Sequence, residues 1–340
     1  GQLSLKTQKV KDVIERIGHQ NPELVKPALG PKEPWAYRNK MQMPVGGTKG
    51  NIQMGFYAMG SHDIVQGTNC PIQDEGNNII AQACYQIAKE FDIEPYDEQT
   101  EKGVLRHIIG RIGQSGWMII LVTATEQLPH KEKWVEKLTE RIPQVETIVH
   151  NVNGKRTNVI LGPKNNILYG DGTITDHIKD LQFTLSPHSF FQVNPEQTTV
   201  LYDQALTYAD LKGDETVIDA YCGTGTISLF LAHKAKHVIG IEIVEPAIIN
   251  ARENAKRNGY DNTEFIVADA AVEMPKLYKA GVRPDVIVFD PIRAGCKEEV
   301  LTSAAGMEPK RIVYVSCNPA TMARDIEILT HYGYELQEVQ

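Results

Sequence analysis

The stretch VIDAYCGTGTISLFLA, residues 217–232, decides the fold of the second half of the chain. A β-branched run ends in Asp219, a turn carries Gly223 and Gly225, and an apolar, helix-like segment follows. Glycines in a strand-to-helix turn let the backbone approach a ligand closely. The pattern therefore predicts a cofactor site at the carboxyl end of a parallel strand.

The same alternation continues from this stretch to the end of the chain. Each short β-branched run is followed by a helix-like segment, and the expected strands are 216–220, 237–243, 263–269, 285–290 and 311–316. This rhythm is typical of an α/β fold with a Rossmann-like, doubly wound, mostly parallel sheet. A sixth strand is expected at YELQEV (334–339), so the full protein is expected to continue beyond Gln340.

The residues upstream follow another pattern. Short alternating runs between Gly, Pro and Asn turns predict a central α+β domain, rich in antiparallel pairing, at 31–185. Within it, helices are expected at 76–92 and 130–141. A helix over about 2–18, within an N-terminal segment 1–30, is expected to pack on the catalytic domain at 186–340.

Composition excludes several classes of protein. With 340 residues, 41% hydrophobic and 23% charged, the chain is neither disordered nor fibrous. No apolar stretch approaches the ~18 residues that cross a bilayer, and no signal peptide is visible, which predicts a soluble, cytoplasmic protein without a membrane partner. Five cysteines without a CxxC pair argue against a disulfide framework and predict no metal site.

The charge is unevenly distributed. Residues 181–340 hold 14 basic and 22 acidic side chains, which is the whole net charge of -8, whereas residues 1–50 hold 9 basic and 4 acidic ones. A nucleic acid would therefore be held by a local patch and not by the overall field of the protein.

Two features favour S-adenosylmethionine (SAM) over a nicotinamide dinucleotide. Ser228 replaces the third glycine of a GxGxxG turn, and Asp269 ends the third strand, where a carboxylate can accept a hydrogen bond from adenine N6. Glu242 ends the second strand, where it can bind ribose hydroxyls, and Tyr221 can pack against the cofactor. Both cofactors remain open from this turn alone.

Two further residues are expected at the same sheet edge. Asp290 follows the fourth strand in DPIRAGC, and Cys317 follows the fifth strand in YVSCNPATMARD. Asp290 is equally suited to a helix N-cap and Arg293 to a surface ion pair. Cys84, Cys222 and Cys296 are interpreted as small buried hydrophobic residues, whereas a thiolate at position 317 could reach a substrate beside the methyl donor.

A methyltransferase needs a thiolate when the acceptor is a pyrimidine C5 carbon. Addition of sulfur to C6 of uracil makes C5 nucleophilic, and a base later removes the C5 proton so that the thiolate can leave. Methylation of an oxygen or an exocyclic nitrogen needs no such cysteine. The pairing of Cys317 with a SAM turn therefore points to pyrimidine C5 chemistry.

Four linked motifs together resemble the RNA uracil-5-methyltransferases, in particular the branch that acts on 23S ribosomal RNA: SPHSFFQVNPEQTTVLYDQAL (186–206), DAYCGTGTISLFLA, DPIRAGC and IVYVSCNPATMARD. The likeness extends upstream through WAYRNKMQMPV (35–45), GFYAMGSHDIV (55–65), GVLRHIIGR (103–111) and NILYGDGTITDHI (166–178). It implies a class I SAM-dependent methyltransferase domain beside an RNA-binding central domain. The sequence says nothing of oligomeric state, and a monomer without a protein partner is the default expectation.

The resemblance also assigns residues. It makes Cys317 the nucleophile that attacks uracil C6 on the way to 5-methyluridine. It places Gln192, Tyr221, Glu242 and Asp290 on SAM and Phe190 on the flipped target base. Basic residues of the central domain are expected to contact RNA phosphates: Arg38, Lys40, Arg106, His107 and Arg111.

The chain departs from the family pattern at several points. The family's general base, a Glu in a His-x-Glu segment, is expected beyond Gln340, and the small N-terminal RNA-binding barrel that members commonly carry (the TRAM domain) is not expected within these residues. Cys70 stands where the fourth ligand of an iron–sulfur cluster would lie, and Ile292 replaces a proline of DPPR. A transfer-RNA substrate, a cytosine C5 acceptor, a non-catalytic RNA-binding module and a nicotinamide oxidoreductase remain as alternatives.

Overall fold

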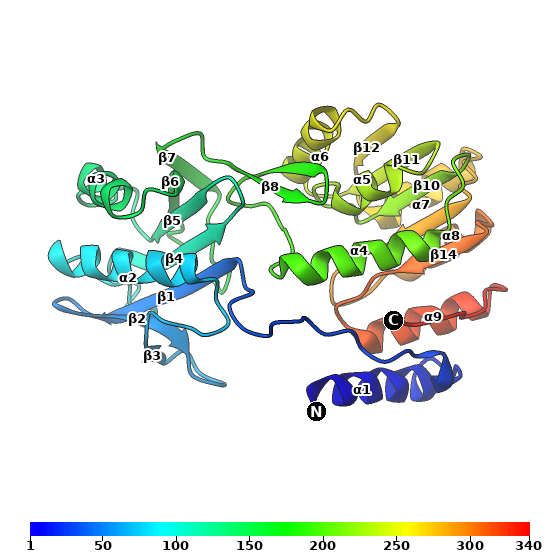
Figure 1. Cartoon of the computed structure of the whole chain (residues 1–340), viewed down its shortest axis with the longest axis horizontal. Helices are drawn as coiled ribbons and strands as arrows, with labels where there is room; N and C mark the ends of the chain where they lie inside the picture. Colours follow the sequence, from blue (N-terminus) through cyan, green and yellow to red (C-terminus); the bar gives the residue numbers. More distant parts are fainter. The chain divides into compact units, whose positions relative to one another are not determined.

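A five-stranded parallel sheet organises the second half of the chain (Figure 1). The computed structural model describes residues 1–340, and all neighbouring strands of this sheet run parallel. Their order is β12-β11-β10-β13-β14, which confirms the doubly wound α/β fold. The bounds are β10 (Thr216–Ala220), β11 (His237–Glu242), β12 (Thr263–Val267), β13 (Val286–Phe289) and β14 (Arg311–Tyr314).

Helix α4 (Pro195–Ala209) precedes the first of these strands, and one helix follows each strand: α5 (Thr226–Ala232), α6 (Glu245–Arg257), α7 (Ala270–Lys279), α8 (Glu298–Gly306) and α9 (Pro319–Thr330). Because parallel crossovers are right-handed and the strand order reverses between β10 and β13, α5 and α6 cover one face of the sheet and α7 and α8 the other. The apolar strand residues, such as Ile218, Ile241 and Ile287, are buried between these layers.

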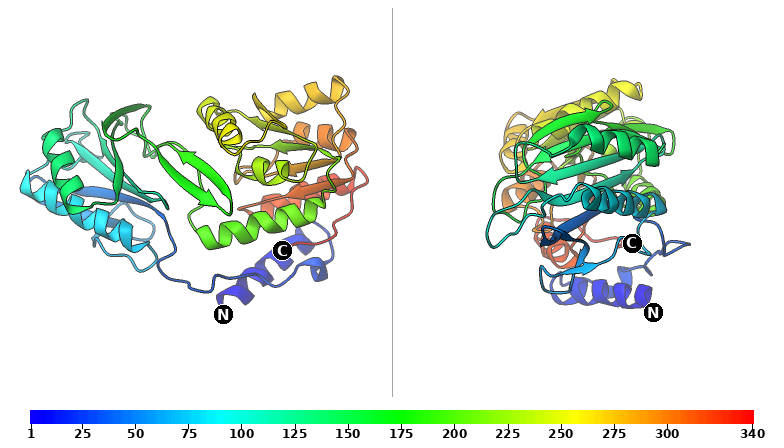
Figure 2. Two further views of the ribbon diagram at one scale, coloured as in Figure 1. Left: turned by 45° about the horizontal axis from the view of Figure 1, so that its top comes forward. Right: turned by 90° about the vertical axis from the view of Figure 1, so that its left-hand side faces the viewer.

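The N-terminal helix α1 (Gln2–Arg16) packs on α9, within the same unit (Figure 2). Ile14 of α1 is buried in a small cluster with Met322, Ala323 and Ile326 of α9. After a short 3-10 turn, η1 (Pro22–Leu24), the chain continues as an extended segment. None of the helices is long and apolar enough to cross a membrane.

The expectation of a sixth strand at 334–339 is wrong. Only Val339 forms a β-bridge, parallel to Val25, and the Lys26 amide donates a hydrogen bond to its carbonyl oxygen at 2.8 Å. Leu336 and Val339 pack on the cluster around Ile14 and do not pair with β14. The alternating apolar residues therefore mark an extended segment that covers α1, not a strand of the sheet.

Residues Lys32–Glu196 form a separate unit around a seven-stranded sheet. Its order is β3-β2-β1-β4-β5-β6-β7, and only β5 and β6 pair in parallel, because α3 connects them. The elements are β1 (Lys40–Thr48), β2 (Asn51–Tyr57), β3 (Ile64–Gln66), α2 (Glu75–Glu90), β4 (Leu105–Ile112), β5 (Trp117–Thr123), α3 (Lys131–Arg141), β6 (Val145–Val152) and β7 (Lys164–Tyr169), followed by a hairpin of β8 (Ile174–Ile178) and β9 (Leu181–Leu185).

This unit ends after Glu196, later than the boundary expected near residue 186. The intervening residues are tied to the seven-stranded sheet by backbone contacts. Arg111 of β4 donates a hydrogen bond to the Ser189 carbonyl oxygen at 3.0 Å, and the Asn39 amide donates one to the Val193 carbonyl oxygen at 2.9 Å. These long-range hydrogen bonds leave no local signal in the sequence, which explains the displaced boundary.

Candidate active site

All five strands of the parallel sheet end at one edge, and each is followed by a candidate site residue. In sheet order these are Asp269 after β12, Glu242 on β11, the glycine turn after β10, Asp290 after β13 and Cys317 after β14. The strand order reverses between β10 and β13. Ligands of open α/β sheets bind outside the carboxyl ends of the strands at such a reversal.

The turn after β10 contains two glycines whose surroundings differ. Both have positive φ, +56° at Gly223 and +83° at Gly225, which disfavours a side chain. A Cβ at Gly225 would lie 3.0 Å from that of Ala251, so this glycine allows α6 to pack closely. A Cβ at Gly223 would meet nothing within 4 Å, so open space lies over the turn at that position.

Two buried polar atoms of this turn have no partner. Asp219 is fully buried, and its Oδ2 accepts a hydrogen bond from Ser228 Oγ at 2.6 Å, whereas its Oδ1 and the hydroxyl of Thr224 bond nothing. Buried polar atoms normally find partners. These two unpartnered atoms lie beside the open space at Gly223, which fits a polar ligand over the turn. Ser228, which stands in place of a third glycine, orients Asp219 through its hydrogen bond.

Burial, with a smaller contribution from the nearby carboxylates of Asp290 and Glu242, raises the pKa of Asp219 to about 7. Burial alone raises the pKa of Asp290 to about 6. Asp219 and Asp290 therefore lie at this edge of the sheet without a cationic partner. A ligand that carries positive charge would stabilise their ionised forms.

Glu242 and Asp269 are already hydrogen-bonded to the backbone. Glu242 accepts from the Gly223 amide at 3.1 Å and from the Val244 amide at 3.0 Å, which fixes the carboxylate beside the turn. Asp269 is the N-cap of α7, accepting from the Ala271 amide at 2.9 Å. Both carboxylates keep lone pairs for a ligand, since a carboxylate has about four acceptor positions.

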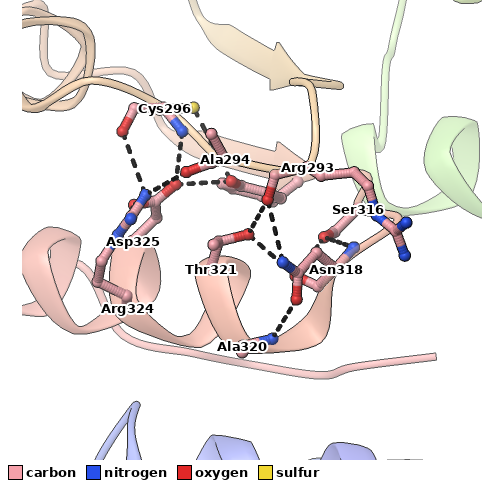
Figure 3. A network of polar contacts seen from close by, with 10 residues as sticks. Arg293, Ala294, Cys296, Ser316, Asn318, Ala320, Thr321, Arg324 and Asp325 are labelled. Carbon is pink, nitrogen blue, oxygen red and sulfur yellow. Dashed lines mark hydrogen bonds and ion pairs between the residues drawn. The ribbon is translucent and has the colours of Figure 1, made fainter. Parts of the chain in front are cut away.

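The loops that carry Asp290 and Cys317 are connected through Arg293 (Figure 3). The Arg293 carbonyl oxygen accepts hydrogen bonds from Asn318 Nδ2 at 3.1 Å and from Thr321 Oγ1 at 2.8 Å. Asn318 also caps α9 by accepting from the Ala320 amide. Since Asn318 follows Cys317 directly, these bonds position the thiol-bearing loop against the loop after β13.

Asp325 of α9 makes the second connection (Figure 3). Its fully buried carboxylate accepts from the Cys296 amide at 2.8 Å and from the Tyr314 hydroxyl at 2.6 Å. Arg324 donates to Asp325 Oδ1 at 3.0 Å and to the Ala294 carbonyl oxygen at 2.8 Å. Sequence reasoning missed this pair, although a charged Arg-Asp dipeptide in the middle of an otherwise apolar helix was a usable signal.

The cysteines separate cleanly by exposure. Cys84, Cys222 and Cys296 are buried, as expected, and burial raises the pKa of each thiol, that of Cys296 to about 12. Cys317 is exposed at the end of β14. A thiol must be accessible to attack a substrate, so Cys317 is the cysteine of this unit suited to nucleophilic chemistry.

The remaining predicted residues lie in the Lys32–Glu196 unit. Phe190 is 69% exposed, and Gln192 is half-buried, with its carbonyl oxygen 3.5 Å from Asn39 Nδ2. Arg38 and Lys40 are half-buried, and burial, followed by Arg111 and Arg38, lowers the pKa of Lys40 to about 8.

Three of the expected phosphate contacts, Arg106, His107 and Arg111, have largely buried side chains, so each presents little of its side chain to a ligand. Arg106 and Arg111 each bond backbone carbonyl oxygens: Arg106 those of Asn153 and Lys155, and Arg111 that of Ser189. Burial lowers the pKa of His107 to about 4, with Arg106 adding to the effect. Through these hydrogen bonds Arg106 and Arg111 anchor loops inside the unit.

No group of three or more His, Cys, Asp or Glu side chains is placed to hold a metal ion. Cys70 is half-exposed, and its backbone amide and carbonyl both bond the Asn78 side chain, at 2.9 and 3.3 Å.

Comparison with known proteins identifies a methyltransferase domain in this chain. A family model described as a methyltransferase domain matches residues 211–333. An uncharacterized RNA methyltransferase of Halalkalibacterium halodurans is 51% identical over 100% of this chain and 74% of its own length. One from Clostridium tetani is 49% identical with the same coverage.

Among solved structures, the chain resembles the tRNA (uracil-54, C5)-methyltransferase of Pyrococcus abyssi, crystallised in complex with S-adenosyl-L-homocysteine. The TM-score is 0.77 at 26% identity, and the match covers 96% of this chain and 77% of that one.

Proposed function

The chain belongs to the RNA methyltransferases, and on this basis we propose that it transfers the methyl group of SAM to C5 of a uridine in 23S ribosomal RNA, giving 5-methyluridine. The observation that carries the proposal is an exposed Cys317 at the same sheet edge as the glycine turn and Asp290, with its loop anchored to the loop after β13.

The class I methyltransferase fold and the residues of the turn fit SAM. When bound, SAM supplies an electrophilic methyl group on a positively charged sulfur. Glu242 is oriented to accept hydrogen bonds from ribose hydroxyls, and the open space at Gly223 admits the ligand close to the backbone. The unpartnered Asp219 Oδ1 and Thr224 hydroxyl are available for its polar groups, and Tyr221, Asp269 and Gln192 are proposed as further contacts.

Cys317 carries the covalent chemistry of the proposal. Its thiolate forms a bond to C6 of the uracil, and the electron pair of the C5–C6 double bond moves to make C5 nucleophilic. After C5 has been alkylated, loss of the C5 proton to a base restores the double bond and expels the thiolate. Asp290, with a pKa of about 6, can hold a proton near the uracil edge, and Phe190 is proposed to stack on the flipped base.

Transfer RNA is the second candidate substrate. The structural likeness to an enzyme whose name specifies uracil 54 of tRNA favours it. The motifs that resemble the ribosomal RNA branch favour 23S ribosomal RNA. Both substrates use the same chemistry at Cys317. We propose that the protein acts as a monomer, which the elution volume in size-exclusion chromatography measures directly.

Covalent trapping tests the function. The protein is incubated with SAM and either 23S ribosomal RNA or tRNA containing 5-fluorouridine, whose fluorine cannot leave as a proton does. A protein–RNA adduct on a denaturing gel is expected for the protein with Cys317 and not for Cys317→Ala. The RNA that gives the adduct identifies the substrate class. No adduct with either RNA, from protein that binds SAM, would overturn the proposed chemistry.

A further inference from the structure

A polar hollow of about 370 Å³ opens on the Lys32–Glu196 unit, apart from the residues of the candidate active site. Four segments that are distant in sequence line it. His62 comes from the turn between β2 and β3, Tyr96 and Glu98 from the loop after α2, Arg106 from β4 and Arg156 from the loop between β6 and β7.

Arg106 places a fixed positive charge in the wall of this hollow. It is only 5% exposed, and its guanidinium lies over the ring of Tyr96, 4.3 Å from the centroid. Its Nη1 donates to the carbonyl oxygens of Asn153 and Lys155 at 2.6 and 2.7 Å. These partners are uncharged, so the arginine keeps its full charge in a setting of low dielectric constant, where it attracts an anion more strongly than in water.

Arg156 brings a second guanidinium to the hollow. Its side chain is 69% exposed, and its ion-pair partner, Glu101, is 4.0 Å away, the outer limit for such a pair. An exposed pair at this distance contributes little stability, so Arg156 can exchange its partner for a phosphate at small cost. The loop between β6 and β7 thus supplies an exposed positive charge beside the buried one of Arg106.

His62 presents a flat ring at the same hollow. It stacks on Tyr57 with the ring centroids 4.8 Å apart and an interplanar angle of 15°. Glu98 Oε2 lies 2.9 Å from His62 Nδ1, which holds the imidazole in place while its side chain stays 58% exposed. A supported, exposed ring beside two guanidinium groups is the combination that binds unpaired nucleotides, because the base stacks and the phosphate is neutralised.

We propose that this hollow binds one nucleotide of single-stranded RNA other than the reacting uridine, with the phosphate on Arg106 and Arg156 and the base on His62. The inference rests on the proposed function, which makes RNA the substrate. A base in a duplex is stacked on its neighbours, so the occupant is an unpaired segment of the RNA. An acidic peptide would satisfy the arginines but would leave the stacked rings without a role.

Fluorescence anisotropy with a labelled single-stranded oligouridylate and the full chain tests this site. Arg156→Ala is expected to weaken binding and to reduce the slope of log K against log salt by about 0.7, the value for one phosphate contact on a single strand. His62→Ala is expected to weaken binding about fivefold or more through lost stacking, and His62→Phe to restore it. Arg141→Ala, which removes an arginine paired with Glu90 elsewhere on this unit, is the matched control and leaves binding unchanged.

The outcomes separate this site from the methyl transfer. Unchanged affinity and salt slope in both Arg156→Ala and His62→Ala would overturn the inference, as would equal displacement of the RNA by polyglutamate of the same charge. The absence of measurable RNA binding by the unaltered protein would overturn it too. If RNA binding depends on Arg156 and His62 but no 5-fluorouridine adduct forms, the subsite stands and the proposed function fails.

Discussion

The carboxylate of Asp325 accepts a hydrogen bond from the backbone amide of Cys296 at 2.8 Å, joining helix α9 to the loop after β13. Asp325 is fully buried and also accepts from Tyr314 and Arg324. Through this carboxylate the segment after Asp290 and the segment after Cys317 are held as one body. The position of Asp290 relative to Cys317 therefore depends on a fully buried residue.

Replacing Asp325 is expected to lower both stability and turnover. Asp325→Ala leaves a buried amide and hydroxyl unpaired and should cost about 3 kcal/mol of unfolding free energy, measured by urea denaturation. Asp325→Asn keeps one acceptor oxygen and should cost less. The structural role of Asp325 predicts a lower kcat in Asp325→Asn with unchanged SAM affinity, and normal kcat in this variant would contradict it.

The two glycines of the turn are expected to respond differently to alanine. Gly225→Ala should destabilise the protein by about 1–2 kcal/mol, because φ is +83° and the new methyl group approaches Ala251 at 3.0 Å. Gly223→Ala meets no neighbour and should cost only the φ penalty of about 1 kcal/mol. The new methyl group at position 223 enters the open space over the turn. Gly223→Ala should therefore lower SAM affinity by more than its small loss of unfolding free energy would explain.

Thermal unfolding and SAM titration calorimetry measure these two effects separately. Gly213→Ala, at a positive-φ position with open surroundings outside the site, controls for the backbone penalty. Equal SAM affinity in Gly223→Ala and Gly213→Ala would mean that the ligand does not approach this turn.

Asp219 and Asp290 are expected to make the protein less stable as the pH rises from about 4 to about 7. His107, whose pKa burial lowers to about 4, opposes this contribution below about pH 6.5. The folded pKa of Asp219 is about 7 and that of Asp290 about 6, both above the ordinary value of 3.8. Between these values the folded protein binds protons that the unfolded chain has released, so unfolding becomes easier as the pH rises. Urea denaturation across this range measures the slope.

Asp219→Asn removes the larger of these two contributions and should flatten the dependence of unfolding free energy on pH. Asp285→Asn is the control. The carboxylate of Asp285 accepts a hydrogen bond from the Thr216 amide. An identical slope in Asp219→Asn and the unaltered protein would show that Asp219 is ionised at low pH in the folded state.

Cys317→Ala is expected to abolish methyl transfer without changing the fold. The side chain is exposed, so the unfolding free energy should remain within about 0.5 kcal/mol of the unaltered value. SAM affinity should also be retained, because the thiol acts on the RNA base. The matched change at a buried thiol, Cys296→Ala, should instead lower stability by about 1–2 kcal/mol through lost packing. Residual turnover by Cys317→Ala would exclude its role as the nucleophile.

Local patterns in the sequence predicted the features that depend on neighbouring residues. The β-branched runs identified all five parallel strands, and their order of appearance placed Asp290 and Cys317 at one edge of the sheet. The sequence also placed the turn that contains Gly223 and Gly225 correctly, directly after the first parallel strand. The pattern at 334–339 failed because alternation predicts an extended backbone but does not say which element the segment pairs with.

The sequence alone determined the positions of the five parallel strands and the family, and it singled out Cys317 as the candidate nucleophile, because period, turn chemistry and motif spacing are properties of consecutive residues. Tertiary structure decided which charges are buried. The sequence suggested a phosphate contact for Arg106 and no role for Asp325, yet Arg106 is buried against backbone carbonyl oxygens and Asp325 joins α9 to the loop after β13. The reason is physical: burial and hydrogen-bond partners come from residues tens of positions away, and only the folded chain brings those residues into contact.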